Sequence, residues 1–309
     1  MKIGKIFLTG STGMLGQNII KNNNEFEILN PNREQLNLLD YQSVFNYIKK
    51  NKPNFIIHAA AIVGGIKFNI MNQIKMLNEN TQISHNLIMA AYNNKIKNLM
   101  NISSSCIYPP TAKNPLKEES LLSNKFEPTN EGYALSKIYS IKLCQFINEK
   151  NKYFKYKTIV PCNLYGRFEK FDLSKSHLIS AAVKKIYISK KKNKKIVEIW
   201  GSGNVKREFM YVEDLVNFIF FSINNYKKIP NIINCGYGTD YKIKKYYQII
   251  ANELNYKGKF IYNLKKPEGQ KKKLLDISKQ TILGWRPRYS LKEGIKQTIN
   301  FFLKKNSLN

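Results

Sequence analysis

The sequence is poor in cysteine, histidine and long apolar runs, and each shortage excludes a class of protein. Its 309 residues include 4 cysteines and 3 histidines, with no CxxC pair and no spacing typical of a metal site. We therefore expect neither a disulfide framework nor a bound metal. No stretch is apolar over the ~18 residues that a membrane-spanning helix requires, so we expect no membrane partner.

The beginning of the chain also lacks the marks of a secretion signal. The stretch MKIGKIFLTGSTG is a short apolar run that ends in threonine and glycine. A longer apolar region followed by a small-residue cleavage site would be needed for secretion. The stretch is instead typical of a first β-strand, and we expect a cytoplasmic protein.

Acidic residues and arginine are scarce as well. The chain has 51 basic and 21 acidic residues and a formal net charge of +30, which can indicate nucleic-acid or membrane-surface binding. Arginine, whose planar fork reads phosphates and bases, occurs only at Arg33, Arg167, Arg207, Arg286 and Arg288. Because the lysines are spread along the whole chain, we expect no nucleic-acid partner and a positive field that favours anionic small molecules.

The first half of the chain alternates short apolar runs with longer amphipathic ones. The strand-like runs are KIFLTG, EFEILNP, NFIIHAAA, NLMNISSS and YKTIVPCNLYG. This alternation predicts βαβ units and an α/β fold, a Rossmann-like, doubly wound parallel sheet. The pattern is less regular after Gly166, which predicts a smaller α/β C-terminal substrate domain. We assign residues 1–165 and about 204–235 to the first domain, and mainly residues 166–309 to the second.

The glycine-rich stretch TGSTGMLG lies between the first strand and the first helix. Gly10 permits a tight turn, Gly13 lets the backbone approach a pyrophosphate, and Gly16 permits close packing of helix and sheet. The N-terminus of the helix then faces the phosphates. A glycine triplet is a weak signal alone, but its place at the first βα junction predicts a dinucleotide site.

The end of the second strand-like run indicates which dinucleotide is bound. An NAD site usually has an acidic residue there for the ribose 2′-hydroxyl, whereas this chain has Asn30 and then Arg33. A guanidinium pairs with the 2′-phosphate that a carboxylate would repel, so we expect NADPH/NADP+. Asp40 either caps the following helix or contacts the adenine.

The stretch YALSK places Tyr133 and Lys137 one turn apart on one helix face. The ammonium can lower the phenol's pKa and hold the ribose, and the phenol can give its proton to a carbonyl oxygen as hydride arrives. Ser104, at the end of the preceding strand, would donate a second hydrogen bond to that oxygen. The polar stretch EPTNEG before this helix is suited to capping it.

The order of glycine loop, strand-end serine and YxxxK resembles the extended short-chain dehydrogenase/reductase family, which modifies nucleotide sugars. The chain is similar in particular to the GDP-L-fucose synthase group of that family. The stretches that carry the resemblance are TGSTGMLG, NREQLNLLD, AAAIVGGI, SSSCIYP, EPTNEGYALSKI, PCNLYG, SHLI, WGSGNVKREFMYVEDL and KKLLDISKQTILGW. The resemblance implies NADPH-dependent C4 reduction of a GDP-linked 4-keto-6-deoxy-sugar, a hexose or a heptose, for surface glycan synthesis. It also implies a homodimer formed by the helices near residues 74–94 and 133–150.

The resemblance implies further contacts along the ligands. On the cofactor side these are Thr12, Met14, Leu15, Ala59, Ala60, Ala61, Pro161, Asn163 and Leu164. On the substrate side they are Val63, Gly64, Ser105, Asn163, His177, Trp200 and Arg207. Arg207 is the natural partner of a diphosphate because its fork is bidentate, and the alternative is a salt bridge to Glu208, Glu213 or Asp214.

Cys106 separates a plain ketoreductase from an epimerase. A 4-keto sugar is acidic at C3 and C5, and inversion there needs a base on one face and an acid on the other. Cys106 lies two residues past Ser104, so in an extended segment both side chains point the same way. The resemblance implies that Cys106 and His177 form this pair. By itself, such a cysteine or histidine is more often part of the packing, and we assign Cys144, Cys162 and Cys235 to the core.

Several functions stay open at this stage. Some members of the resembled group only reduce C4 after a separate 3,5-epimerase. A nucleotide-sugar 4-epimerase or 4,6-dehydratase could use the same fold, although a dehydratase would usually have an acidic pair where this chain has Cys106 and Ile107. A non-catalytic protein that senses NADPH is disfavoured because Ser104, Tyr133 and Lys137 are all present.

Overall fold

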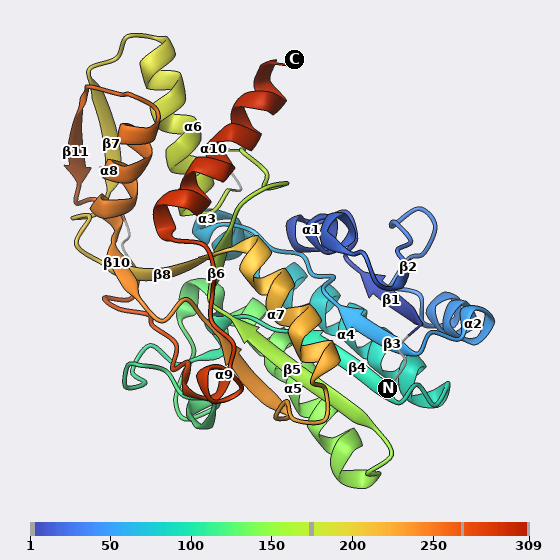
Figure 1. The fold of residues 1–309 in the computed structure, drawn as a ribbon. Coiled ribbons are helices and arrows are strands. Elements are labelled where there is room, and N and C mark those ends of the chain that lie inside the picture. Colours follow the sequence, from blue (N-terminus) through green and yellow to red (C-terminus); the bar gives the residue numbers. More distant parts are fainter. Residues whose placement is uncertain (1–3, 173–175, 267–268, 308–309) are drawn as a thin grey trace.

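The larger part of the molecule is built on a six-stranded sheet in which every pairing is parallel (Figure 1). The computed structural model describes residues 4–172, 176–266 and 269–307. In spatial order the strands are β2 (Glu27–Leu29), β1 (Lys5–Thr9), β3 (Phe55–His58), β4 (Asn98–Ile102), β5 (Lys155–Pro161) and β9 (Ile232–Cys235). The order reverses at β1, so the loops at the carboxyl ends of the neighbouring strands β1 and β3 lie side by side.

Helices cover both faces of this sheet because the strands are apolar on both sides. On one face, Phe7, Ile56 and Leu99 pack against α2 (Tyr41–Asn51), α4 (Gln73–Asn93) and α5 (Glu131–Lys150). On the other face, neighbouring strand residues pack against α1 (Met14–Asn22) and α7 (Val212–Asn224). The predicted α/β class with a Rossmann-like doubly wound sheet is confirmed.

Much of the second half of the chain forms a second lobe (Figure 1). This lobe has its own apolar core. Its strands form a three-stranded sheet of β10 (Asp240–Lys242), β8 (Lys206–Tyr211) and β6 (Asn163–Tyr165), and a pair of β11 (Lys259–Asn263) and β7 (Ile196–Trp200). Its helices are α6 (Leu178–Lys191), α8 (Ile243–Glu253) and α10 (Leu291–Ser307). Shorter elements are α3 (Ile66–Met71), η1 (Ser105–Ile107), η2 (Glu118–Ser120), η3 (Pro128–Asn130) and α9 (Ser278–Ile282).

The prediction of one strand over YKTIVPCNLYG is wrong. The run forms two strands, β5 in the large sheet and β6 in the small one, and the chain changes sheets at Cys162. The run is interrupted only by Pro161 and Cys162, so its residue pattern did not show that the chain passes from one sheet to another. β8 lies in the segment 204–235, yet it pairs with β6 in the small sheet, whereas β9 of that segment joins the large sheet. The domain bounds stay a prediction.

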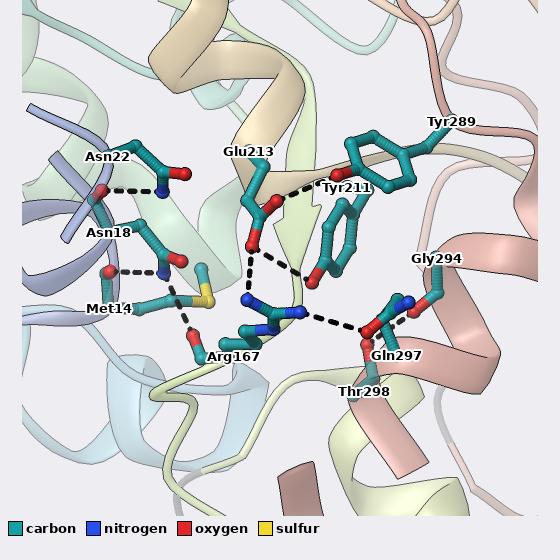
Figure 2. A network of polar contacts seen from close by, with 10 residues as sticks. All are labelled: Met14, Asn18, Asn22, Arg167, Tyr211, Glu213, Tyr289, Gly294, Gln297 and Thr298. Carbon is teal, nitrogen blue, oxygen red and sulfur yellow. Dashed lines mark hydrogen bonds and ion pairs between the residues drawn. The ribbon is translucent and has the colours of Figure 1, made fainter. Parts of the chain in front are cut away.

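A network of hydrogen bonds and an ion pair joins α1, which packs on the large sheet, to the second lobe (Figure 2). The Asn18 side-chain amide donates to the carbonyl of Arg167 at 3.0 Å. The Arg167 guanidinium pairs with Glu213 at 3.0 Å and donates to Gln297 of α10 at 2.9 Å. Glu213 also accepts from Tyr289 at 2.8 Å. The glycine loop, which precedes α1, is thereby held in register with the second lobe.

In the described part of the chain, no helix has the length and apolar character needed to cross a membrane.

Candidate active site

The glycine loop fits a dinucleotide because two of its glycines leave no room for a side chain. Gly10 has φ of 73°, and a Cβ there would lie 2.7 Å from the backbone of Ala59 and Ala60. A Cβ on Gly16 would lie 2.2 Å from the Gly10 carbonyl oxygen. These contacts bring the start of α1 against the loop and against the end of β3. The N-terminus of α1 is left open at Gly13, which caps the helix without a side-chain hydrogen bond.

The contacts around Gly16 and Gly13 predict different effects for an alanine at each position. We expect Gly16→Ala to cost roughly 3 kcal/mol of unfolding free energy, because its Cβ would collide with backbone. Gly13→Ala should fold, since its Cβ would lie 3.3 Å from the Gly10 oxygen. It should weaken NADPH binding by about tenfold, because the methyl group faces the pyrophosphate. Chemical denaturation and NADPH titration measure the two effects, and equal NADPH affinity for Gly13→Ala and the wild type would contradict this assignment.

A hollow of about 480 Å³ lies beside the glycine loop. It is lined by Ser11, Thr12, Gln17, Ile20, Asn30, Asn32 and Gln35. The absence of a carboxylate from this lining suits a 2′-phosphate, and the hydroxyl and amide groups can donate to it. Arg33 is exposed and does not line the hollow. Asp40 caps α2, accepting from the backbone of Gln42 and Ser43, so the capping alternative holds.

The chain turns directly after β4, which corrects the geometry expected for Ser104 and Cys106. Residues Ser105–Ile107 form a 3₁₀ turn, not an extended segment. The alternation of a strand therefore does not apply between Ser104 and Cys106. Ser104 instead caps the 3₁₀ turn, because the Cys106 N–H donates to its side-chain oxygen at 3.4 Å. The Ser104 side chain also hydrogen-bonds to the Cys106 thiol, and the neighbouring Ser105 is buried.

α5 brings Tyr133 and Lys137 to this turn, and both side chains are buried. The Lys137 ammonium donates to the Ile102 carbonyl at 3.0 Å and lies 5.7 Å from the centre of the Tyr133 ring. The prediction that EPTNEG caps this helix is wrong, because Asn130 makes no side-chain capping bond. Gln73 of α4 performs that task, accepting from the Gly132 N–H at 2.8 Å.

Burial is the largest influence on the pKa values of Lys137, Tyr133 and Cys106. It lowers the pKa of Lys137 to about 8 and raises the pKa of the Tyr133 phenol. Burial also raises the pKa of the Cys106 thiol, while the positive charges of Lys273 and Lys137 and a hydrogen bond from Ser104 oppose that shift. Sequence reasoning missed Lys273. Its position in a run of lysines hid it, and only the fold brings it near Cys106.

The lowered pKa of Lys137, about 8, predicts the pH above which the reduction rate falls. The reduction rate should be level up to about pH 8 and then fall by up to about tenfold per pH unit, because the ammonium loses its proton. Lys137→Arg keeps its charge at high pH, so whatever activity it retains should not fall in that range. A pH profile of single-turnover NADPH oxidation measures both. Parallel profiles for the two proteins would contradict the assignment.

The second lobe carries three of the other predicted residues, His177, Asn163 and Arg207. His177 is exposed and precedes α6, and in the described residues no hydrogen bond or ion pair joins it to Ser104, Cys106, Tyr133 or Lys137. The Asn163 amide donates to the Glu208 carbonyl at 2.9 Å, and so holds β6 to β8. Arg207 donates to the backbone carbonyl of Lys206. Its three proposed acidic partners all bind elsewhere: Glu213 pairs with Arg167, and Glu208 and Asp214 accept from backbone N–H groups.

Trp200 is 43% exposed and lies between two ammonium groups. The Lys185 nitrogen is 5.2 Å and the Lys266 nitrogen 5.4 Å from the ring centre. The lysines hold the indole by cation–π attraction, and they place positive charge beside an open aromatic face. Sequence reasoning missed both lysines. The spread of lysine along the chain hides any single functional one.

The remaining predicted residues border the same region. Ala59, Ala60 and Ala61 follow β3 next to the glycine loop, Val63 is exposed, and Gly64 packs against Phe68. Pro161 ends β5, and Leu164 belongs to β6. Cys144, Cys162 and Cys235 are buried, as predicted. In residues 4–172, 176–266 and 269–307, no group of three or more His, Cys, Asp or Glu side chains is arranged to hold a metal.

Comparison with known proteins identifies relatives over the whole length. Residues 6–236 match the model of the NAD dependent epimerase/dehydratase family. The chain is 48% identical to GDP-L-colitose synthase of Yersinia pseudotuberculosis, over 98% of this chain and 99% of that one. It is 38% identical to GDP-L-fucose synthase of Azorhizobium caulinodans, over 98% of both chains. A solved structure of a GDP-mannoheptose C4 reductase from Campylobacter jejuni with NADP bound is 28% identical, with a TM-score of 0.87 over 98% of this chain and 99% of that one.

Proposed function

The chain belongs to the NAD dependent epimerase/dehydratase family, and we propose that it reduces the C4 ketone of a GDP-linked 4-keto-6-deoxy-sugar with NADPH. The observation that carries this proposal is that α5 places the buried side chains of Tyr133 and Lys137 against the end of β4 and the turn that Ser104 caps. The names of the relatives support a GDP-sugar as the substrate class. The candidate sugars for assay are a hexose, a heptose and the precursor of L-colitose.

NADPH is the proposed cofactor because the hollow beside the glycine loop has hydroxyl and amide groups and no carboxylate. The solved relative with NADP bound supports the same choice. Gly10, Gly13 and Gly16 would hold the pyrophosphate end, and Tyr133 and Lys137 would border the nicotinamide ribose. When bound, NADPH supplies the hydride that C4 receives.

The chain's own residues complete the reduction by handling the oxygen of the ketone. Ser104 donates its hydroxyl hydrogen to O4 once the ketone is bound, in place of its hydrogen bond to the Cys106 thiol. Tyr133 gives its phenolic proton to O4, so that the ketone becomes an alcohol. The Lys137 ammonium stabilises the phenolate that remains, and its bond to the Ile102 carbonyl fixes its position. Burial excludes water from this proton transfer.

We propose that Cys106 and His177 epimerise C3 and C5 before reduction. Cys106 as a thiolate would take a proton from the carbon, and the enolate charge on O4 would be stabilised by Ser104 and Tyr133. His177 would return a proton on the opposite face. The positive charges of Lys273 and Lys137 favour the thiolate that this step requires.

A C4 reductase that acts after a separate epimerase is the second candidate. Two observations favour it: burial raises the pKa of Cys106, and His177 is exposed in the second lobe. The solved relative is itself named as a C4 reductase. Exchange of solvent hydrogen at C3 and C5 separates the two candidates.

We also propose a homodimer through α4 and α5. The outer sides of these helices leave large apolar side chains in solvent, among them Ile74 at 86% and Phe146 at 60% exposure. A second copy of the same face would cover them. Sedimentation of the wild type and of Ile74→Lys would measure this association.

Incubation with NADPH and each 4-keto sugar tests the proposed function. Loss of NADPH absorbance should require the GDP-linked ketone and should be faster with NADPH than with NADH. No consumption of NADPH with the hexose, the heptose or the colitose precursor would contradict the proposal.

A further inference from the structure

α4 carries three polar side chains that each hold a segment bordering the active site. Because a helix turns by about 100° per residue, positions 73, 80 and 84 lie within about 40° of one another around the axis. Gln73, Asn80 and Ser84 thus form one polar row on α4, while the buried Asn86 lies outside the row and donates to the Leu38 carbonyl. Buried polar groups at such positions must find partners, and the partners identify what the row does.

Asn80 holds the loop that follows β3. It is 2% exposed. Its side-chain oxygen accepts from the Ile62 N–H at 2.7 Å, and its side-chain nitrogen donates to the Ile62 carbonyl at 3.0 Å. The amide therefore pairs with one residue of the loop as a neighbouring strand would. This fixes both the position and the orientation of the peptide at Ile62.

Ser84 holds the start of the same loop through a buried histidine. The Ser84 oxygen lies 3.1 Å from His58 Nε2, and His58 Nδ1 lies 2.9 Å from the Thr9 oxygen. The Thr9 oxygen accepts from the Ala60 N–H at 3.3 Å. Burial lowers the pKa of His58 to about 3, so the ring is neutral, with one nitrogen donating and the other accepting. The chain of bonds links α4 to the residue before Gly10 and to the loop beside it.

Gln73 fixes the start of α5. Its side-chain oxygen accepts from the Gly132 N–H at 2.8 Å, and its nitrogen donates to the Pro128 carbonyl at 2.7 Å. A Cβ on Gly132 would lie 2.5 Å from the Gln73 carbonyl, so the two helices are in backbone contact there. Tyr133 is the next residue. One helix therefore sets the spacing between the loop beside Gly10 and the start of the helix that carries Tyr133.

We propose that Asn80 is a positioning residue for the cofactor, acting through Ile62. The loop that runs on to Ile62 begins with Ala59 and Ala60, whose backbone would collide with a Cβ on Gly10. A shift of this loop would therefore change the position of the glycine turn that is proposed to bind the cofactor. Asn80 holds one end of the loop while the Ser84–His58 pair holds the other. The inference rests on the proposed NADPH binding, and it adds a residue that touches neither ligand in this account.

Asn80→Asp tests the proposal because its effect should depend on pH. At about pH 8 the ionised carboxylate cannot donate to the Ile62 carbonyl and repels it, and NADP+ should bind about tenfold more weakly than to the wild type. At about pH 5.5 the buried carboxyl becomes protonated, accepts from the N–H and donates to the carbonyl again. Affinity should then return to within about threefold of the wild type at the same pH. Calorimetric titration with NADP+ measures both.

Asn148→Asp is the matched control. Asn148 is a buried asparagine of α5 that pairs in the same way with one backbone residue, accepting from the Tyr156 N–H at 2.8 Å and donating to its carbonyl at 2.7 Å. Tyr156 lies near the amino end of β5, away from the glycine loop. The control should lose thermal stability as Asn80→Asp does, while binding NADP+ like the wild type at both pH values.

Equal NADP+ affinity of Asn80→Asp and Asn148→Asp at about pH 8 would overturn the inference, and so would the lack of recovery at lower pH. If Asn80→Asp does not fold, Ser84→Ala replaces it. That variant should bind NADP+ about threefold more weakly, and unchanged affinity would likewise overturn the inference. A wild type that binds neither NADP+ nor NADPH would contradict the proposed function and this inference together. Binding by the wild type with indistinguishable variants would contradict the inference alone.

Discussion

Tyr133→Phe is expected to lower the rate of C4 reduction by about 10³-fold, because the phenol is the group proposed to give its proton to O4. The ring remains, so its packing and the 5.7 Å approach of the Lys137 ammonium should remain too. NADPH should therefore bind within about twofold of the wild type. Single-turnover NADPH oxidation with saturating ketone measures the rate, and NADPH fluorescence measures the binding.

Tyr139→Phe is the matched control on the same helix. Its hydroxyl lies 2.6 Å from His85 Nδ1 in the pair of α4 and α5, away from the turn at Ser104. The reduction rate of this variant should stay within about twofold of the wild type. If both variants reduce the ketone at similar rates, Tyr133 is not the proton donor.

Cys106→Ser is expected to abolish exchange at C3 and C5 while reduction continues. A hydroxyl is a far weaker acid than a thiol, so the variant cannot form the anion that removes a carbon-bound proton. In D₂O the wild type should place deuterium at C3 and C5 of the product. The variant should lose that label by at least about 10²-fold, as expected when a general base is removed.

The same variant should reduce a ketone that has already been epimerised at a rate within about threefold of the wild type, because Ser104 and Tyr133 are unchanged. Cys144→Ser is the control, since it makes the same exchange at a buried cysteine in the core between α2, α4 and α5. It should keep the deuterium label. Wild-type product without deuterium at either carbon would assign the protein to the C4 reductases that act after an epimerase.

The glycine loop and the alternating first half could be predicted from the sequence because their causes are local. A glycine at φ of 73° and one whose Cβ would collide at 2.2 Å leave few alternatives at Gly10 and Gly16. The run before Gly10 is apolar throughout, as a parallel strand covered on both faces must be. Strand-end serine and YxxxK then follow in the order that places them at one edge of the sheet.

Two predictions near the site were wrong: the extended segment after Ser104 and the capping of α5 by EPTNEG. Both features depend on contacts between distant parts of the chain. The sequence NLMNISSS does not reveal where the strand ends, and the 3₁₀ turn at Ser105 changes how Cys106 relates to Ser104. The polar residues before α5 appeared suited to capping, but Gln73 from another helix satisfies the Gly132 N–H. A single sequence carries no sign of such a partner, because glutamine in a helix is ordinarily a solvated residue.

Lysine is so abundant along the chain that the sequence did not indicate which lysines lie near the predicted site residues. Lys273 lies far from Cys106 in the sequence but acts on its pKa in the fold, and Lys185 and Lys266 lie near Trp200 because α6, β7 and β11 pack together in the second lobe. Asn80 and His58 were hidden for a similar reason, since an amide and an imidazole inside apolar runs are usually satisfied packing. Their partners, Ile62, Thr9 and Ser84, show that they hold a loop beside the glycine turn.

Transfer of labelled hydride tests the central claim most directly. The protein is incubated with the GDP-linked 4-keto-6-deoxy-sugar and NADPH that carries deuterium at the transferable position of the nicotinamide. The account predicts one deuterium at C4 of the product sugar, seen by NMR, with loss of the label from the cofactor. Product with protium at C4, or label that remains on the cofactor while the sugar changes, would contradict it.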